Sequence, residues 1–209
     1  MLSVENDLKM DVHQFDKIAR EVFAPAYVSI AEQIKEKTGV TQGICLDVGS
    51  GGGYLDIALA GITDMVFFLL DQSHEMLDIA KRNIVGSHLE KRLFTLHADV
   101  HSIPLDKESV DLVISRGSVF FWENKTRAFG EIYRVLRPGG RAYIGGGLGR
   151  PEVREQIRTK MLQIDKNWSW RKNGNGDNQE SYREALQKAC IANGSVTKNE
   201  VGTWIEMWK

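Results

Sequence analysis

The chain has 209 residues, of which 42% are hydrophobic, and its 27 Lys and Arg side chains nearly balance 28 Asp and Glu side chains. These values are typical of one domain with a sizeable core, and a net charge of -1 provides no basic surface for nucleic acid or an anionic membrane. No apolar run approaches the ~20 residues of a membrane span, and the acidic N-terminal segment differs from a signal peptide, so we expect a cytoplasmic protein. Cys45 and Cys190 lack the spacing of a bridge or metal site, which predicts buried reduced thiols and no metal.

We expect a single domain at 1–209. Residues 1–40 are predicted to form an N-terminal helical cap, residues 41–147 the ligand-binding core, and residues 148–209 further helices and the last strands. In the cap, apolar residues recur at helical spacing from Phe15 to Phe23 and from Val28 to Ile34, on either side of Pro25. The simplest interpretation is a helix pair that covers one face of a sheet.

The first motif is a buried strand that runs into a glycine loop and then a helix, at 44–60. Glycines at positions 49 and 51–53 allow a tight turn and a close approach of a ligand to the backbone. A dinucleotide fingerprint fits poorly because Tyr54 stands at its third small position, and no Gly-Lys-Ser or Gly-Lys-Thr follows for a P-loop. Asp47 would repel a pyrophosphate but attract an ammonium group. The loop therefore suits a ligand without phosphates.

A second apolar run, 65–70, predicts another buried strand, and it ends in Asp71. An acidic residue at this place in a doubly wound sheet accepts hydrogen bonds from ribose hydroxyls. An ammonium group, a ribose and no phosphate together describe S-adenosylmethionine. The later segments continue to alternate between helices and strands: helices are predicted at 73–84, 125–136, 151–164 and 182–192, strands at 93–97, 110–115, 141–145 and twice within 196–209, and a long loop at 165–178.

Five segments, in the same order, resemble motifs of the class I S-adenosylmethionine-dependent methyltransferases. Within that family the chain is most similar to the small-molecule methyltransferases of the quinone-biosynthesis type. The segments are Leu46–Gly53, Leu70–Ser73, Ala98–Val100, Val110–Ser115 and Leu136–Arg141. The resemblance implies an α/β fold of Rossmann-like type. We therefore expect a doubly wound seven-stranded sheet, mostly parallel, with one antiparallel strand near the edge and helices on both faces.

The resemblance also implies a set of residues that bind the cofactor, S-adenosyl-L-methionine, or its product, S-adenosyl-L-homocysteine. They are Asp47, Gly49, Ser50, Gly51, Asp71, Gln72, Met76, Asp99, Val100 and Arg116. Asp71 would bind the ribose, Gln72 and Met76 would contact adenine, and Asp99 would accept the adenine amine. Met76 could equally be part of the core, and His101 is treated as a surface residue. Four aromatic residues are candidates for the substrate side: Phe15, Tyr27, Phe120 and Trp122.

The expected reaction is methyl transfer to a small-molecule acceptor by in-line displacement, with no nucleic acid or membrane partner. No general base can be identified, since none of the five histidines is paired in sequence with an acid, and the lack of a cysteine cluster argues against arsenite as acceptor. One alternative is a non-catalytic S-adenosylmethionine-binding sensor or pseudoenzyme. Another is a nicotinamide-dependent oxidoreductase, which Asp47 and Tyr54 disfavour. The acceptor, the methylated atom and the oligomeric state stay open.

Overall fold

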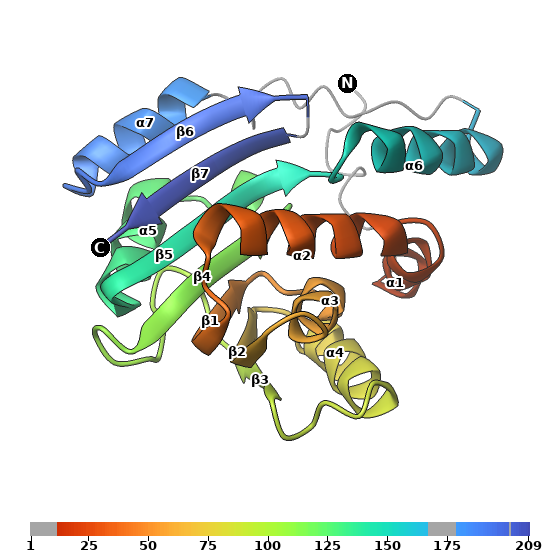
Figure 1. Cartoon of the computed structure of the whole chain (residues 1–209), viewed down its shortest axis with the longest axis horizontal. Helices are drawn as coiled ribbons and strands as arrows, with labels where there is room; N and C mark the ends of the chain where they lie inside the picture. Colours follow the sequence, from red (N-terminus) through yellow and green to blue (C-terminus); the bar gives the residue numbers. More distant parts are fainter. Residues whose placement is uncertain (1–11, 167–178, 201) are drawn as a thin grey trace, which may run out of the picture.

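The computed structural model describes residues 12–166, 179–200 and 202–209, without the side chains of His13 and Phe15. Its described residues contain one seven-stranded sheet in the order β3-β2-β1-β4-β5-β7-β6 (Figure 1). The strands are β1 Gln42–Val48, β2 Asp64–Asp71, β3 Leu93–His97, β4 Val110–Arg116, β5 Leu136–Gly147, β6 Gly194–Asn199 and β7 Gly202–Trp208. Only β7 of these runs antiparallel to both of its neighbours. The predicted fold class is therefore confirmed.

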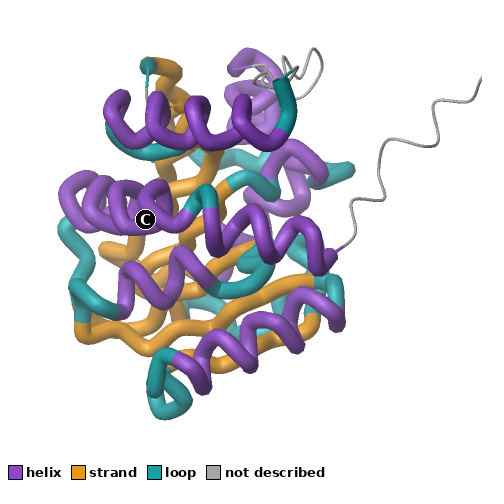
Figure 2. The backbone as a smooth tube through the Cα atoms, turned by 90° about the vertical axis from the view of Figure 1, so that its right-hand side faces the viewer, coloured by secondary structure: helices purple, strands orange, loops and turns teal. Residues whose placement is uncertain are grey.

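Helices cover both faces of this sheet. They are α1 Val12–Glu21, α2 Ala24–Thr38, α3 Tyr54–Ala60, α4 His74–Gly86, α5 Lys125–Val135, α6 Pro151–Ile164 and α7 Gln179–Lys188, with a 3-10 turn η2 at Val119–Phe121. Figure 1 shows α2 in front of the strands and α5 and α7 behind them, and Figure 2 gives the view from the right-hand side. One core cluster includes Ile30 of α2 and Cys45 of β1, whereas the other includes Leu46 of β1 and Phe129 of α5. Successive residues of β1 thus face opposite helix layers, as expected for a buried parallel strand.

The chain order reverses at β1, and this reversal places the site. β1 pairs in parallel with β2 over Gln42–Val48 and with β4 over Cys45–Asp47. The connection to β2 and β3 leaves on one side of β1, and β4 and β5 lie on the other. In open sheets of this kind the crevice for a ligand lies beyond the carboxyl ends of the strands at the reversal point.

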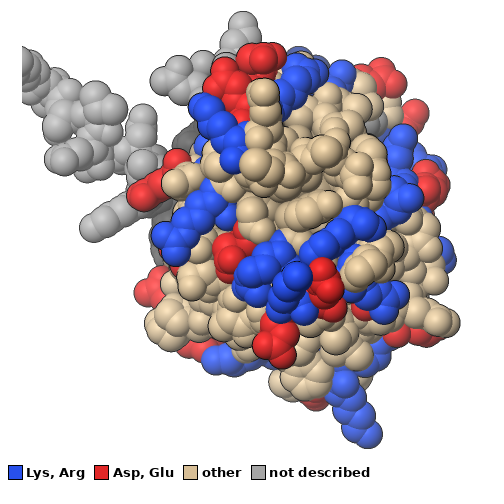
Figure 3. Space-filling model, turned by 90° about the vertical axis from the view of Figure 1, so that its left-hand side faces the viewer, with Lys and Arg blue, Asp and Glu red and all other residues tan. Residues whose placement is uncertain are grey.

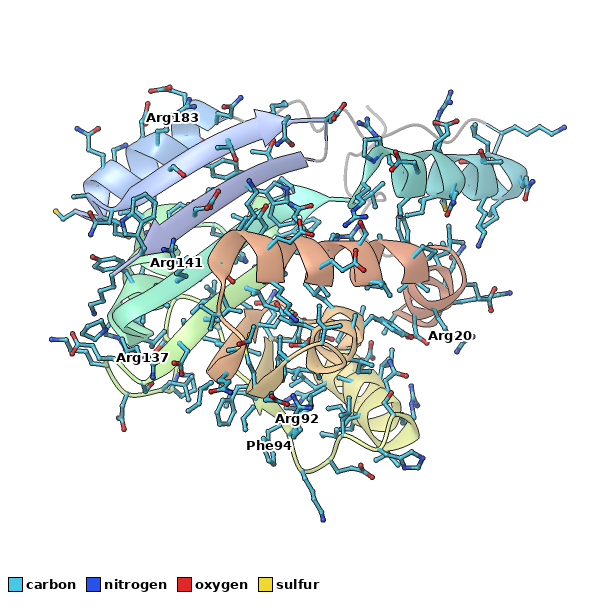
Figure 4. All side chains as sticks on the ribbon, viewed as in Figure 1. Arg20, Arg92, Phe94, Arg137, Arg141 and Arg183 are labelled. Carbon is cyan, nitrogen blue, oxygen red and sulfur yellow. The ribbon has the colours of Figure 1, made fainter. Side chains whose placement is uncertain are left out.

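Local signals explain most element boundaries. Ser73 caps α4, because its side chain accepts a hydrogen bond from the backbone N–H of Met76. Pro25 stands in the first turn of α2, where its missing N–H removes no helical bond. Arg92 donates to the carbonyl oxygens of Ala60, Thr63 and Met65 and so closes the connection between α3 and β2 (Figure 4).

The structure corrects the expected bounds of two elements and the expected burial of one cysteine. β5 begins at Leu136 and not at 141. Its pairing with β4 has an irregular register after Val110, and this irregularity accommodates the glycines that follow Pro138 within the strand. α7 begins at Gln179 and ends at Lys188, so Cys190 lies beyond it and is exposed, not buried. Residues 167–178 of the expected loop lie outside the described residues.

The end of the sheet at which the parallel strands begin carries paired charges. Figure 3 shows Lys and Arg side chains among Asp and Glu side chains on this side of the molecule. Nζ of Lys209 lies 3.2 Å from Oε1 of Glu108, and Arg137 forms an ion pair with Asp111. None of the helices in the described parts of the chain is long and apolar enough to cross a bilayer.

Candidate functional site

A cavity of about 440 Å³ lies where β1, β2 and β4 end. Residues that follow β1 and β2 form one wall: Gly49, Gly51, Asp71, Gln72 and Met76. Residues that follow β3 and β4 form the other: Asp99, Val100, His101, Arg116, Ser118 and Trp122. The structure therefore brings most of the predicted cofactor residues to one cavity, although they are spread over 68 positions of the printed sequence, from Gly49 to Arg116.

Asp71 holds the glycine loop in place. Its Oδ2 accepts a hydrogen bond of 2.9 Å from the N–H of Gly51, and its Oδ1 accepts one of 2.9 Å from the N–H of Ser73. Gly51 has a φ of +55°, and a Cβ added there would meet no protein atom within 4 Å. The backbone of the loop therefore faces open space in the cavity, with a carboxylate directly beside it.

Ser118 joins the two walls of the cavity. Its hydroxyl donates to the carbonyl oxygen of Val48 at 2.8 Å and lies 2.7 Å from the hydroxyl of Ser115. A Cβ added at Gly49 would lie only 2.4 Å from the Cβ of Ser118. Position 49 thus requires a glycine for two reasons: its φ is +73°, and Ser118 packs too closely against it to leave room for a Cβ.

Asp99 and His101 form a clamp at the end of β3. Asp99 Oδ1 accepts the backbone N–H of His101 at 2.8 Å and lies 2.6 Å from Nδ1 of the same residue. The other ring nitrogen, Nε2, accepts the backbone N–H of Asn124 at 3.2 Å, so Nδ1 carries the proton and donates to Asp99. The backbone hydrogen bond from His101 is the largest influence that lowers the pKa of Asp99. Both contacts use Oδ1 and leave Oδ2 of Asp99 available to a ligand.

Arg116 stands between the cavity and the N-terminal helices. Its Nε donates to the carbonyl oxygen of Gly147, and its guanidinium carbon lies 5.5 Å from the ring centres of both Phe23 and Tyr27. Tyr27 is buried and stacks on Tyr54 at 5.5 Å. Stacking against two aromatic faces orients the guanidinium without neutralising it.

Two predicted residues lie near the cavity but do not line it. Asp47 is buried on the face of β1 that α3 covers, where its Oδ1 has no hydrogen-bond partner. Burial is the main reason that the pKa of Asp47 rises to about 7. The hydroxyl of Ser50 is also buried without a partner, while its backbone N–H donates to the carbonyl oxygen of Leu70.

The aromatic residues after β4 divide between core and cavity. Trp122 is buried and lines the cavity, and its ring contacts Phe129 edge-on at 6.1 Å. Phe120 does not line the cavity, because its ring lies against Gly146 of β5. Phe121 instead lines the cavity and is 65% exposed at its mouth. The side chain of Phe15, the remaining candidate, lies outside the described residues.

Several cavity residues were not among the predicted site residues, and those with polar or aromatic side chains are His101, Ser118, Phe121 and Glu123. His101 was expected on the surface, yet its ring closes against Asp99 and lines the cavity. Its position two residues after a predicted ligand-binding carboxylate was the available signal. Ser118 and Glu123 carry no such signal, since their roles depend on the path of the chain after β4.

The open sheet, the glycine loop and the acid after β2 define a Rossmann-like α/β protein with a cavity at its reversal point. Residues 46–144 match the model of the methyltransferase domain family. A crystal structure from Methanococcus maripaludis, assigned to the S-adenosyl-L-methionine-dependent methyltransferases, is 40% identical, covers 99% of this chain and 97% of its own, and superposes with a TM-score of 0.88. The chain belongs to the class I S-adenosylmethionine-dependent methyltransferases.

Two curated relatives are similar over part of their length. The arsenite methyltransferase of Halobacterium salinarum is 38% identical over 102 residues, which are 47% of this chain and 26% of that protein. The demethylmenaquinone methyltransferase of Lactobacillus johnsonii is 33% identical over 116 residues, which are 54% of this chain and 46% of that protein. The chain thus spans about a quarter to a half of the length of these two relatives.

Proposed function

We propose that the protein transfers the methyl group of S-adenosylmethionine to a small-molecule acceptor and releases S-adenosylhomocysteine. The observation that carries this proposal is the charge of the cavity: three carboxylates, of Asp71, Asp99 and Glu123, line it together with one guanidinium, of Arg116. Such a lining repels a polyphosphate and favours a cationic nucleoside. The nicotinamide dinucleotides, which carry a pyrophosphate, fit it poorly.

The cavity also fits the cofactor in size and shape. A volume of about 440 Å³ lies within the usual range for pockets that enclose a small molecule. The open space at Gly51 allows a ligand to approach the backbone, and the hydroxyl of Ser50 is buried without a partner in the same loop. Buried polar atoms without partners are rare in folded proteins, which makes this hydroxyl a candidate for contact with a ligand that the loop holds.

Each end of the cofactor has residues suited to it. Asp71 accepts the ribose hydroxyls, Gln72 and Met76 cover the adenine, Oδ2 of Asp99 accepts its amine, and the backbone N–H of Val100 donates to the ring. At the other end, Gly49, Ser50 and Gly51 leave room for the methionyl group. Asp47 balances its ammonium group, and Arg116 pairs with its carboxylate. These roles are proposed from the placement of the residues around the cavity.

Positioning of the two reactants is the main contribution of this protein to the reaction. A sulfonium methyl group is already activated, so alignment of the acceptor and exclusion of water supply most of what the transfer needs. His101 is unsuited to act as a general base, because Nε2 accepts the N–H of Asn124 and Nδ1 carries the proton. An acceptor that loses its proton readily in solution needs no such base.

The acceptor we propose is an apolar aromatic molecule of the quinol type. Phe121 and Trp122 present aromatic surface at the cavity, and Tyr27 stands behind Arg116. The similarity to a demethylmenaquinone methyltransferase supports this choice. Arsenite is disfavoured because the chain has two cysteines, one buried in β1 and the other exposed after α7.

Calorimetric titration of the purified protein with S-adenosylmethionine, S-adenosylhomocysteine and NADH tests the proposal first. We expect both adenosyl ligands to bind and NADH not to bind; binding of NADH alone would overturn it. A methyl-transfer assay with short-chain quinols, catechols and arsenite then tests the acceptor class. Binding without turnover of any acceptor would instead indicate a sensor or pseudoenzyme.

Replacement of His101 tests the clamp on Asp99. We expect His101→Phe, which removes the Nδ1 donor but keeps a ring, to weaken S-adenosylmethionine binding by about three- to tenfold, because Asp99 is partly exposed and its hydrogen bonds are correspondingly weak. His101→Asn retains a donor at this position and should keep most of the affinity. Isothermal titration measures both variants, and a larger loss in His101→Asn than in His101→Phe would contradict the clamp.

A further inference from the structure

Asp56 is a buried carboxyl group to which the methyl-transfer proposal gives no role. It stands in the first turn of α3 and is fully buried, facing Asp47 across the interface between α3 and β1. Its neighbours along the same face of the helix, Leu59 and Ala60, are ordinary core residues. A charged residue type at such a position is unfavourable unless it is paired or neutral.

The surroundings of the pair supply no counter-charge. Both oxygens of Asp56 and Oδ1 of Asp47 are buried without a hydrogen-bond partner. Within the described residues, no Lys or Arg forms an ion pair with either carboxyl group. The titratable groups that interact with one or both members of the pair are Tyr27 of α2, Cys45 of β1 and Asp71 of β2, and none of these is cationic. Arg116 acts on Tyr27 and is engaged by Gly147 and two aromatic rings.

Two ionised carboxylates cannot remain side by side in this environment. Each would lose its hydration, repel the other and lack a donor. A single proton between them removes one charge and supplies the missing donor. Burial, followed by the charge of Asp47, raises the pKa of Asp56 well above its usual range, and burial raises the pKa of Asp47 to about 7.

We infer that Asp56 is held as a neutral carboxylic acid that donates a hydrogen bond to Asp47, and so fixes both the orientation and the charge of the carboxylate beneath the glycine loop. Asp56 is the donor of the pair because it is the more completely enclosed member and because both of its oxygens lack partners. Asp56 is thus a positioning residue.

The consequence for the cofactor rests on the proposed function. A neutral Asp56 lets the pair present one negative charge, which matches the single positive charge of the ammonium group. Two ionised carboxylates would instead leave an unbalanced negative charge inside the protein. An asparagine at position 56 has nearly the same shape, is always neutral and can donate the same hydrogen bond.

The experiment compares Asp56→Asn with Asp56→Leu and measures the carboxyl groups directly. We expect the carboxyl-carbon NMR signal of Asp56 in the empty wild-type protein to remain that of a protonated acid at neutral pH. Asp56→Asn should bind S-adenosylmethionine within about threefold of the wild type, whereas Asp56→Leu, which lacks a donor, should bind about tenfold more weakly. An ionised Asp56 signal, or an equal loss in both variants, would overturn the inference. If Asp56→Leu does not fold, the NMR signal of wild-type Asp56 and the affinity of Asp56→Asn still decide whether the inference holds.

These readouts separate this inference from the proposed function. Failure of the wild-type protein to bind S-adenosylmethionine would refute the function, while the carboxyl signal of the empty protein would still show whether Asp56 holds a proton. Asp64→Asn is a matched control, because Asp64 is an exposed carboxylate at the beginning of β2. It should leave the signal of Asp56 and the affinity unchanged.

Stability as a function of pH gives a second, ligand-free test. The folded pKa values of Asp47 and Asp56 lie above the unfolded value of 3.8, so the stability they contribute is complete below that pH and is lost as the pH rises, for Asp47 through about 7. Asp56→Asn removes one of the two groups and should flatten this decline, so that the variant is the more stable protein above neutral pH. Urea unfolding between about pH 5 and 8 measures the slope, and identical slopes would contradict the inference.

Discussion

Asp71→Ala is expected to weaken S-adenosylmethionine binding by about 100-fold, or about 2.7 kcal/mol. The substitution removes the proposed acceptor of the ribose hydroxyls and also leaves the N–H groups of Gly51 and Ser73 without their acceptor. The loop and its ligand thus lose the same carboxylate. Isothermal titration gives the affinity, and circular dichroism checks that the variant is folded.

The control for this variant lies on the same strand. Asp64→Ala removes the exposed carboxylate at the opposite end of β2, away from the cavity, and should leave the affinity unchanged. Asp71→Asn should fall between wild type and Asp71→Ala, because one oxygen remains to accept from a backbone N–H. A folded Asp71→Ala protein with wild-type affinity would contradict the proposed ribose contact.

Gly49→Ala should reduce the free energy of unfolding by about 3 kcal/mol and greatly weaken cofactor binding. A residue with a Cβ at φ +73° is strained by about 1–2 kcal/mol, and the new methyl group would overlap Ser118, whose displacement adds about 1–3 kcal/mol. Movement of Ser118 would also break its hydrogen bond to Val48. Urea unfolding and titration with S-adenosylmethionine measure the two effects.

Gly139→Ala separates backbone strain from overlap. Gly139 has a φ of +83°, but a Cβ added there would meet no atom within 4 Å, so only the strain remains. The double variant Gly49→Ala with Ser118→Gly removes the overlap and should recover part of the lost stability. Equal losses in Gly49→Ala and Gly139→Ala would show that Ser118 does not constrain the loop.

Most of the sheet could be predicted because its strands are continuous apolar runs between turn signals. β3 has the predicted boundaries, and β2 extends the predicted run by one residue at each end. β5 was predicted too short, since Pro138 and its glycines indicate a turn, whereas pairing of Leu136 with Val110 of β4 extends the strand to the other side of them. Single-sequence patterns do not contain this tertiary pairing.

The site was predictable where a residue acts through its position after a strand. Asp71 is the last residue of β2 and Asp99 lies two residues beyond the end of β3, so their place at the cavity follows from the parallel sheet. The pairing of Asp47 with Asp56 could not be read in this way, although the inward position of Asp56 beside Leu59 on a short helix was a signal. The position of His101 could not be predicted, because it depends on how the chain runs to Asn124, whose backbone N–H donates to the His101 ring.

The hydrogen bond from Ser118 to Val48 joins residues 70 positions apart, and it bears on how the protein folds. The glycine loop and Asp71 are close in sequence and belong to one β1-α3-β2 unit, but the opposite wall is added only when β4 pairs with β1. Contacts of such large sequence separation form late, because a long loop must close before they stabilise the chain. We therefore expect the cavity to be completed only after β4 has paired with β1. A cofactor that binds it stabilises only the finished sheet, and ligand protection measures complete folding more sensitively than helix content does.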